Sequence, residues 1–279
     1  MKVPIPEYVR ALRPYVPGKP IEQVQRELGL SDVIKLASNE NPLGPSPRVR
    51  DAVAKAATGL AMYPEGDAPN LRTAVARHLD VPEDTLVFGN GSDEVIHILC
   101  QVFLQPGDNA VQGDPSFAMY EIYTAQCDAR SVKVPLCNMT HDLDAMVDAI
   151  DDRTRIVFVA NPNNPTGTYV DRPRVERFLS RLPEGVLLVM DEAYHEYVDA
   201  DKFDLPARPR RPRYRDPAHL LESLCARRPA GWLRDHDTGD RVDPQPRPFA
   251  VQCQLARPGG GRCRARRSGP CRPGSRPQP

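Results

Sequence analysis

The amino-acid sequence predicts an α/β fold, with a mainly parallel sheet and flanking helices. Short apolar runs alternate with amphipathic stretches from about residue 32 to residue 190. Two of these runs, Arg155 to Ala160 and Val186 to Met190, are almost continuously apolar, which is typical of strands buried on both faces. Because helical stretches separate the runs, the connections are of the kind that builds a parallel sheet.

The expected elements follow from this alternation. Strands are predicted over Val33–Leu36, Thr85–Phe88, Asn109–Gln112, Ser131–Pro135, Arg155–Ala160 and Val186–Met190. Helices are predicted over Ser92–Phe103, Ala118–Ala125, Leu143–Ile150 and Arg172–Leu182. The first helix has Ser92 or Asp93 available as a cap, and its apolar stripe consists of Val95, Ile96, Leu99 and Val102.

The charge distribution divides the chain. Its 37 basic and 37 acidic residues cancel overall, but residues 205–279 hold 17 arginines, 13 prolines and no lysine against six acidic residues, a net charge of +11. Periodicity also stops there, and the closely spaced prolines would break a helix. We therefore expect an N-terminal arm over residues 1–30, a partial large domain over residues 31–204, and a disordered tail over residues 205–279.

Composition also bears on compartment and partners. The N-terminus has no apolar run of signal-peptide length, and no stretch approaches the roughly 20 apolar residues of a membrane span. The seven cysteines show no metal-ligand spacing with histidines, so reduced cysteines, no metal site and a cytoplasmic location are expected. The tail has charge for nonspecific nucleic-acid binding but few aromatics, so no specific nucleic-acid partner is expected.

Polar clusters follow three of the expected strands, at the strand ends where parallel sheets bind ligands. Gly89 to Glu94 feeds a helix start, and is either an ordinary capped turn or an anion site made by free backbone N–H groups. Asn161 to Gly167 gathers several amides around two X-Pro steps that restrict the chain. Asp191 directly follows an apolar run, and is either a helix cap or a charge that meets a cation in a buried pocket.

These clusters together resemble a known family. NPNNPTG followed by DEAY, preceded by KLASNENPLGPSP and GNGSDE, is similar to the fold-type I pyridoxal-phosphate-dependent aminotransferases of the class II family. The opening RALRPYVPGKP resembles the histidinol-phosphate aminotransferase branch, and the resemblance covers roughly residues 7–203. It implies the large domain of that fold, pyridoxal 5′-phosphate as cofactor, and a homodimer. The implied reaction moves an amino group between L-histidinol phosphate and 2-oxoglutarate in histidine biosynthesis.

The resemblance also implies which residues contact the cofactor ring. Asp191 would pair with the ring nitrogen N1 and keep it protonated, so that the ring acts as an electron sink. Asn164 and Tyr194 would hydrogen-bond the 3′ oxygen. Phe117 would stack on the ring, with core packing as the alternative.

Further residues are implied for the phosphate and the substrate. The phosphate would lie at the helix start formed by Ser92, Asp93 and Glu94. Tyr63 would reach the phosphate of the neighbouring subunit, while Tyr15 and Asn41 would contact substrate. Packing in a core or an interface is the alternative for both tyrosines.

One required residue has no match. The family's Schiff-base lysine normally lies about thirty residues beyond the aspartate of DEAY, in a Ser-Lys step, and it moves the proton during transamination. The only lysine after Asp191 is Lys202, eleven residues on and without a preceding serine. No catalytic residue is therefore assigned. The family's small C-terminal domain, with its substrate-binding arginines, also has no counterpart in the sequence.

A one-base change of reading frame near Leu205 is our hypothesis for this departure. Synonymous codons for Asp216 to Arg234 can be chosen so that reading from the second base gives TRHTFSKVYALAGLRVGY, the string that the family would carry here. The lysine codon then comes from the last two bases of the Glu222 codon and the first of the Ser223 codon. The alternative is a genuine disordered basic tail.

Other functions remain open at this stage. An aromatic-amino-acid aminotransferase or a phosphate-amino-acid decarboxylase would share most of the motifs. From a different class, the chain would be a non-catalytic remnant that dimerises or holds pyridoxal phosphate without a covalent link.

Overall fold

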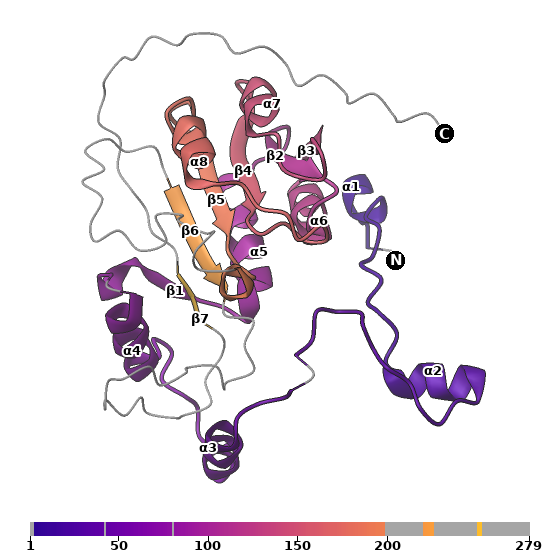
Figure 1. Ribbon diagram of the computed structural model, residues 1–279. Helices are drawn as coiled ribbons and strands as arrows, with labels where there is room; N and C mark the ends of the chain where they lie inside the picture. The colour runs from indigo at the N-terminus through magenta and orange to yellow at the C-terminus, as the bar shows by residue number, and fades with distance from the viewer. Residues whose placement is uncertain (1–2, 42, 80, 199–219, 226–249, 253–279) are drawn as a thin grey trace.

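The computed structural model describes residues 3–41, 43–79, 81–198, 220–225 and 250–252. In these ranges seven strands form one sheet: β1 (Leu86–Phe88), β2 (Asn109–Asp114), β3 (Arg130–Pro135), β4 (Thr154–Ala160), β5 (Leu187–Asp191), β6 (Leu220–Cys225) and β7 (Ala250–Gln252). The strand order is β1-β7-β6-β5-β4-β2-β3 (Figure 1). Neighbouring strands run parallel except where β7 pairs with β1 and β6, which confirms the predicted mainly parallel α/β fold.

The helices connect these strands and extend the chain before them. They are α1 (Glu7–Arg10), α2 (Ile21–Leu28), α3 (Pro47–Ala57), α4 (Pro69–Leu79), α5 (Gly91–Phe103), α6 (Ala118–Gln126), α7 (Leu143–Asp148) and α8 (Arg172–Leu179), with short 3₁₀ turns at Glu83–Thr85 and His195–Tyr197. Helices α5 to α8 confirm the predicted helices to within a few residues at each end. Helices α2 and α3 lie away from the sheet (Figure 1).

The central strands are buried on both faces, as their continuous apolar character predicts. In β4, Ile156 and Phe158 belong to a core cluster with residues of α5 and α6. The intervening Val157 and Val159 belong to a second cluster with residues of α7 and α8. Since successive side chains of a strand point to opposite faces, β4 supplies both cores at once, and all four of these side chains are fully buried.

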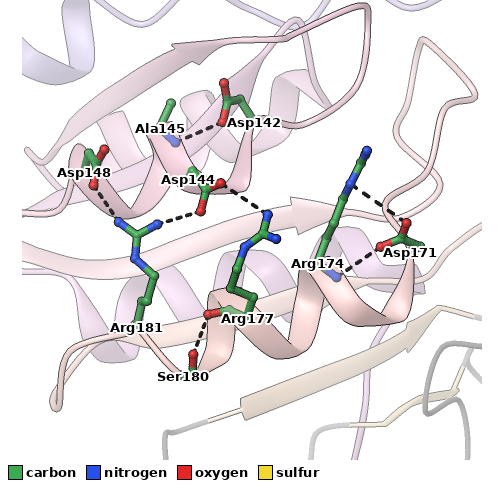
Figure 2. Close-up of polar contacts among 9 residues, drawn as sticks. All are labelled: Asp142, Asp144, Ala145, Asp148, Asp171, Arg174, Arg177, Ser180 and Arg181. Atoms are coloured by element: carbon green, nitrogen blue, oxygen red, sulfur yellow. Dashed lines mark hydrogen bonds and ion pairs between the residues drawn. The ribbon is translucent and has the colours of Figure 1, made fainter. Parts of the chain in front are cut away.

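An ion-pair network fastens α7 to α8 on the outer surface of the second cluster (Figure 2). Arg181 donates to Asp144 at 2.6 Å and to Asp148 at 2.7 Å, and Arg177 donates to Asp144 at 3.2 Å. Each helix also has an aspartate as N-cap, Asp142 in α7 and Asp171 in α8. Exposed ion pairs contribute little singly, about 0–1 kcal/mol each, so the apolar cluster beneath supplies most of the attachment.

Two predictions about elements are wrong. Val33–Leu36 forms no strand, because no described strand pairs with it, and Ile34 and Leu36 remain 82% and 91% exposed. Val102 does not join the buried stripe of α5 and is 61% exposed, because it lies near the end of the helix, beyond the part that packs on the sheet. Helices α1 to α4 were not predicted, although Ile21, Val24 and Leu28 recur at helical spacing in α2; α2 and α3 bury almost nothing.

Strands β6 and β7 lie within residues 205–279, where no periodic element is expected from sequence. β6 pairs with the edge of β5 that faces away from β4, with Leu188 opposite Leu220 and Asp191 opposite Ser223. Pairing of this kind satisfies backbone N–H and C=O groups that an open edge would leave free. The remainder of the predicted tail lies outside the described residues.

Two further findings concern composition. None of the described helices combines the length and apolar character that a membrane crossing requires. In the described ranges Cys100, Cys127 and Cys137 form no disulfide. Burial raises the pKa of the Cys100 thiol to about 12. Cys100 therefore stays protonated and unreactive at neutral pH.

Candidate active site

A small cavity opens at the carboxyl ends of β4 and β5. It is lined by Ser92, Phe117, Ala160, Pro162, Asn164, Asp191, Ala193 and Tyr194. Parallel pairing places Ala160 opposite Asp191 at this end of the sheet, so the loops after both strands meet. The cavity brings together five residues that the sequence predicts as cofactor contacts: Ser92, Phe117, Asn164, Asp191 and Tyr194.

Asp191 is the buried charge of this cavity, at 4% exposure. The hydroxyl of Tyr120 donates to its Oδ2 at 2.6 Å, and the backbone N–H of Ala193 donates to its Oδ1 at 3.1 Å. A buried carboxylate is tolerated where such donors replace water. Of the two interpretations that the sequence left open, the buried pocket is the one that the geometry matches, because the short 3₁₀ turn that follows begins only at His195.

The loop after β4 is fixed by two asparagines, which leaves a third for the cavity. Asn161 accepts from Val170 N at 2.8 Å and donates to Val170 O at 3.0 Å. Asn163 accepts from the Ser116 hydroxyl at 2.8 Å and donates to Pro115 O at 3.1 Å. The two Asn-Pro bonds of the loop, before Pro162 and Pro165, are cis. Asn161 and Asn163 are thus used to shape the loop, while Asn164 lines the cavity.

Tyr194 connects the cavity to the N-terminal part of the chain. The side-chain amide of Asn39 donates to the Tyr194 hydroxyl at 2.9 Å. Asn39 and the preceding Ser38 both have positive φ, 49° and 71°, in the left-handed region that asparagine adopts more readily than most residues. The loop before α3 is therefore turned so that an amide reaches the cavity rim.

Only part of the predicted phosphate cluster faces the cavity. Ser92 is buried and lines it, whereas Asp93 accepts from the Tyr123 hydroxyl at 2.6 Å. Glu94 accepts from the backbone N–H of Asn90. The predicted capping by Ser92 or Asp93 is wrong, because α5 begins at Gly91 and Asn90 is its N-cap, without a side-chain cap hydrogen bond.

Three predicted contacts lie outside this cavity. Tyr15 is 55% exposed, Tyr63 is fully exposed, and Asn41 is half-buried. None of them is among the residues that line the cavity. The Nδ2 of Asn41 is buried without a hydrogen-bond partner, while its Oδ1 accepts from Leu43 N at 3.0 Å. One amide donor of Asn41 is therefore left without a hydrogen bond among the described residues.

The buried side chain of His141 contacts the end of β4, where the loop that lines the cavity begins. Nε2 of His141 lies 3.1 Å from Ala160 O, so this nitrogen carries the proton and donates. Gly113 leaves room for the ring, because a Cβ there would lie 2.3 Å from His141 Nδ1. Burial lowers the pKa of His141 to about 4, since the charged imidazolium is disfavoured away from water.

Comparisons with known proteins agree with this geometry. The family model for aminotransferase class I and II matches residues 31–224. The chain belongs to the class I and II aminotransferases. It is 53% identical over 199 residues to histidinol-phosphate aminotransferase from Geobacillus thermodenitrificans, an alignment that covers 71% of this chain and 54% of the relative. It is 50% identical over 197 residues to the enzyme of the same name from Moorella thermoacetica, covering 71% and 51%.

A solved structure shows the same relationship. The crystal structure of histidinol-phosphate aminotransferase from Sinorhizobium meliloti, in complex with pyridoxal 5′-phosphate, matches with a TM-score of 0.67 at 26% identity, over 78% of this chain and 57% of that one. The chain spans about half the length of the curated relatives that it matches. The resemblance stated from the sequence motifs is thereby confirmed at the level of the aminotransferase family.

Sequence analysis did not predict several residues that contact the lining of the cavity. Asn39, Tyr120, Asn163 and His141 each hydrogen-bond a lining residue or its loop. Asn163 lies in the motif NPNNPTG and Asn39 in KLASNENPLGPSP. Both residues could therefore have been predicted from these motifs. Tyr120 and His141 stand among ordinary helix and loop residues, and only the tertiary structure shows their contacts.

We expect His141 to make the aminotransferase fold less stable in mild acid. Because the folded pKa of about 4 lies below the unfolded value of about 6.5, the unfolded chain binds the proton first. The stabilisation that the neutral ring contributes is fully present above about pH 6.5. It decreases as the pH falls toward 4, and the total loss in unfolding free energy is up to about 3 kcal/mol. The measurement is urea unfolding between pH 7.5 and 4.5.

The matched variant is His141→Gln, whose amide keeps a donor for Ala160 O but does not titrate. The difference in unfolding free energy between the two proteins should shrink as the pH falls, because every other titrating group is shared. A pH-independent difference would show that His141 does not carry this effect.

Proposed function

We propose that the cavity binds pyridoxal 5′-phosphate. The observation that carries the proposal is Asp191, a buried carboxylate at the end of β5, held by Tyr120 and Ala193 N–H and facing a cavity whose other lining includes an aromatic ring and an amide. When bound, the cofactor supplies an electron sink for chemistry at the substrate Cα. The pyridoxal 5′-phosphate in the Sinorhizobium meliloti structure supports the same assignment.

The residues present fit this cofactor. Asp191 would hold the protonated ring nitrogen, Phe117 would cover the ring, and Asn164 with Tyr194 would bind the 3′ oxygen. Ser92, in the first turn of α5, would receive the phosphate with the backbone N–H groups there. Asn39 would hold the Tyr194 hydroxyl in place. Asn41, whose Nδ2 lacks a partner, has a free donor for a substrate anion.

The reaction that this site supports best is transfer of an amino group between L-histidinol phosphate and 2-oxoglutarate. The support comes from relatives named histidinol-phosphate aminotransferase at 50% identity and above. An aromatic-amino-acid aminotransferase or a phosphate-amino-acid decarboxylase would use the same cofactor contacts, and the residues that separate these reactions lie beyond the half of the relatives that the chain spans.

The chain itself favours cofactor binding without catalysis. No lysine is among the described residues that line the cavity. Among the described lysines, Lys19, Lys35 and Lys133 form ion pairs with Glu27, Glu40 and Glu121. Lys202, the only lysine after Asp191, falls outside the described residues. We therefore propose that pyridoxal 5′-phosphate binds here through noncovalent contacts alone.

The expected result is reversible binding of pyridoxal 5′-phosphate to the full chain, measured by equilibrium dialysis. Asp191→Asn should weaken binding by about 10- to 100-fold, because it removes a charged hydrogen bond. Asp144→Asn, on the outer face of α7, is the matched control and should bind as the unmodified chain does. Borohydride treatment followed by peptide mass mapping should find no lysine modified stoichiometrically at one position.

A stoichiometric cofactor adduct on a single lysine, together with turnover of histidinol phosphate, would contradict noncovalent binding. Equal affinities of the Asp191→Asn and Asp144→Asn variants would contradict the site.

We further propose that the reading frame of this chain changes near Leu205. The register of β6 supports the idea, because Glu222 lies opposite Met190 and Ser223 opposite Asp191. In the shifted frame, the lysine codon would be made from bases of the Glu222 and Ser223 codons. The shifted strand would read Thr-Phe-Ser-Lys and bring its lysine beside the end of β5, next to the cavity.

Deleting one base of the gene between codons 205 and 216 tests this proposal. The product should carry a lysine that borohydride fixes to pyridoxal 5′-phosphate, and it should transaminate histidinol phosphate; replacing that lysine with alanine is the control. A gene whose shifted frame encodes no Ser-Lys step at this point would rule the change of frame out.

We also propose that two copies of the chain associate, as the resemblance implies, through a face around Tyr63. Tyr63 is fully exposed, and the neighbouring Leu60 and Met62 are 80% and 78% exposed. Apolar side chains gathered in this way favour an interface. Burying them against a second copy would remove this area from water and would bring Tyr63 toward the partner's cavity.

Sedimentation velocity should give twice the chain mass of 31.0 kDa. Met62→Glu should weaken the dimer at least tenfold, because a charge would enter the buried face. Met139→Glu, in the connection between β3 and α7 and 55% exposed, is the control. A dimer equally stable in both variants would place the interface elsewhere.

A further inference from the structure

Tyr120 is a fully enclosed polar side chain beside the cavity. It lies in the first turn of α6 and is fully buried. Its ring stacks on Phe158 of β4, with 4.6 Å between ring centroids and 3° between planes. Phe117 meets its edge at 5.5 Å and 84°. Packing on two sides fixes both side-chain torsions, so the hydroxyl has one position.

The Tyr120 hydroxyl donates a hydrogen bond to the Asp191 carboxylate. The 2.6 Å distance from the hydroxyl to Oδ2 is typical of a hydroxyl that donates to an ionised carboxylate. Ala193 N–H binds the other oxygen, Oδ1. Each oxygen of the carboxylate therefore accepts a hydrogen bond, Oδ2 from the Tyr120 side chain of α6 and Oδ1 from the Ala193 backbone. Because Tyr120 is not among the residues that line the cavity, its hydroxyl acts on a ligand through Asp191.

We propose that Tyr120 is a positioning residue, which holds the Asp191 carboxylate in the orientation that binds a protonated ring nitrogen. The proposal rests on the proposed cofactor site. Tyr120 also links the parts of that site, since its ring packs against the predicted stacking residue Phe117 while its hydroxyl holds the predicted charge partner. A shift of α6 would therefore move both contacts together.

The test compares two ligands that differ only at the ring nitrogen. These are pyridoxal 5′-phosphate and its 1-deaza analogue, in which carbon replaces N1, and equilibrium dialysis against the full chain gives both affinities. The unmodified chain should prefer the natural cofactor. Tyr120→Phe keeps the ring stacking and loses only the hydroxyl; it should bind the natural cofactor about tenfold more weakly and the deaza analogue within twofold of the unmodified chain.

Two further variants separate positioning from general packing. Tyr123→Phe removes another hydroxyl of α6, the one bound to Asp93 at 2.6 Å; any effect should fall equally on both ligands, because they share the same phosphate. In an Asp191→Asn background, Tyr120→Phe should change the preference no further, since its effect passes through that carboxylate.

The outcomes distinguish the two proposals. If the unmodified chain binds both ligands equally, Asp191 does not contact the ring nitrogen, and the cofactor site and the role of Tyr120 are both contradicted. If the unmodified chain discriminates and Tyr120→Phe discriminates equally well, the cofactor site stands and the positioning role is overturned. Equal weakening of both ligands by Tyr120→Phe also overturns it, because that pattern indicates a packing effect.

Discussion

The site depends on keeping one carboxylate buried at the end of a strand. Asp191 ends β5, which is buried on both faces, so water cannot solvate its charge and protein donors must do so. Tyr120 and Ala193 N–H meet that need. The surrounding residues hold these groups in place. Phe158 stacks on Tyr120, and hydrogen bonds of Asn161 and Asn163 fix the loop after β4. Asp191 is at the same time one of the residues that line the cavity.

Sequence alone predicted the parts of the fold that have a strong apolar pattern. Strands β4 and β5 were found because they are almost continuously apolar, and helix α5 because Val95, Ile96 and Leu99 recur at helical spacing. The stretch Val33–Leu36 has a strand-like composition, but a strand needs a partner, and pairing is a tertiary property. Helices α2 and α3 were not predicted, although Ile21, Val24 and Leu28 of α2 recur at helical spacing; both helices bury almost no side chains.

For the candidate site too, the sequence predicted some residues and missed others. Asp191, Asn164 and Tyr194 were found because they stand in motifs at strand ends, and Phe117 and Ser92 because the resemblance assigns them. Tyr120 and His141 could not be found from sequence, since each is buried and each is defined by a contact with a residue at least 19 positions away. Asp93 and Glu94 belong to the right motif, yet their carboxylates are taken by Tyr123 and by the Asn90 N–H.

Backbone pairing and side-chain chemistry make separate demands on the strand beside Asp191. The edge of β5 accepts a parallel neighbour through N–H and C=O groups that every residue except proline provides, so β6 can occupy this place with Leu-Leu-Glu-Ser-Leu-Cys. Covalent attachment of the cofactor requires an amine at one register position, and no pairing rule supplies it. A change of reading frame that leaves an unbroken strand there would therefore preserve the architecture of the sheet and remove the chemistry. The aminotransferase fold and the catalytic power of this chain are, on this argument, separable properties.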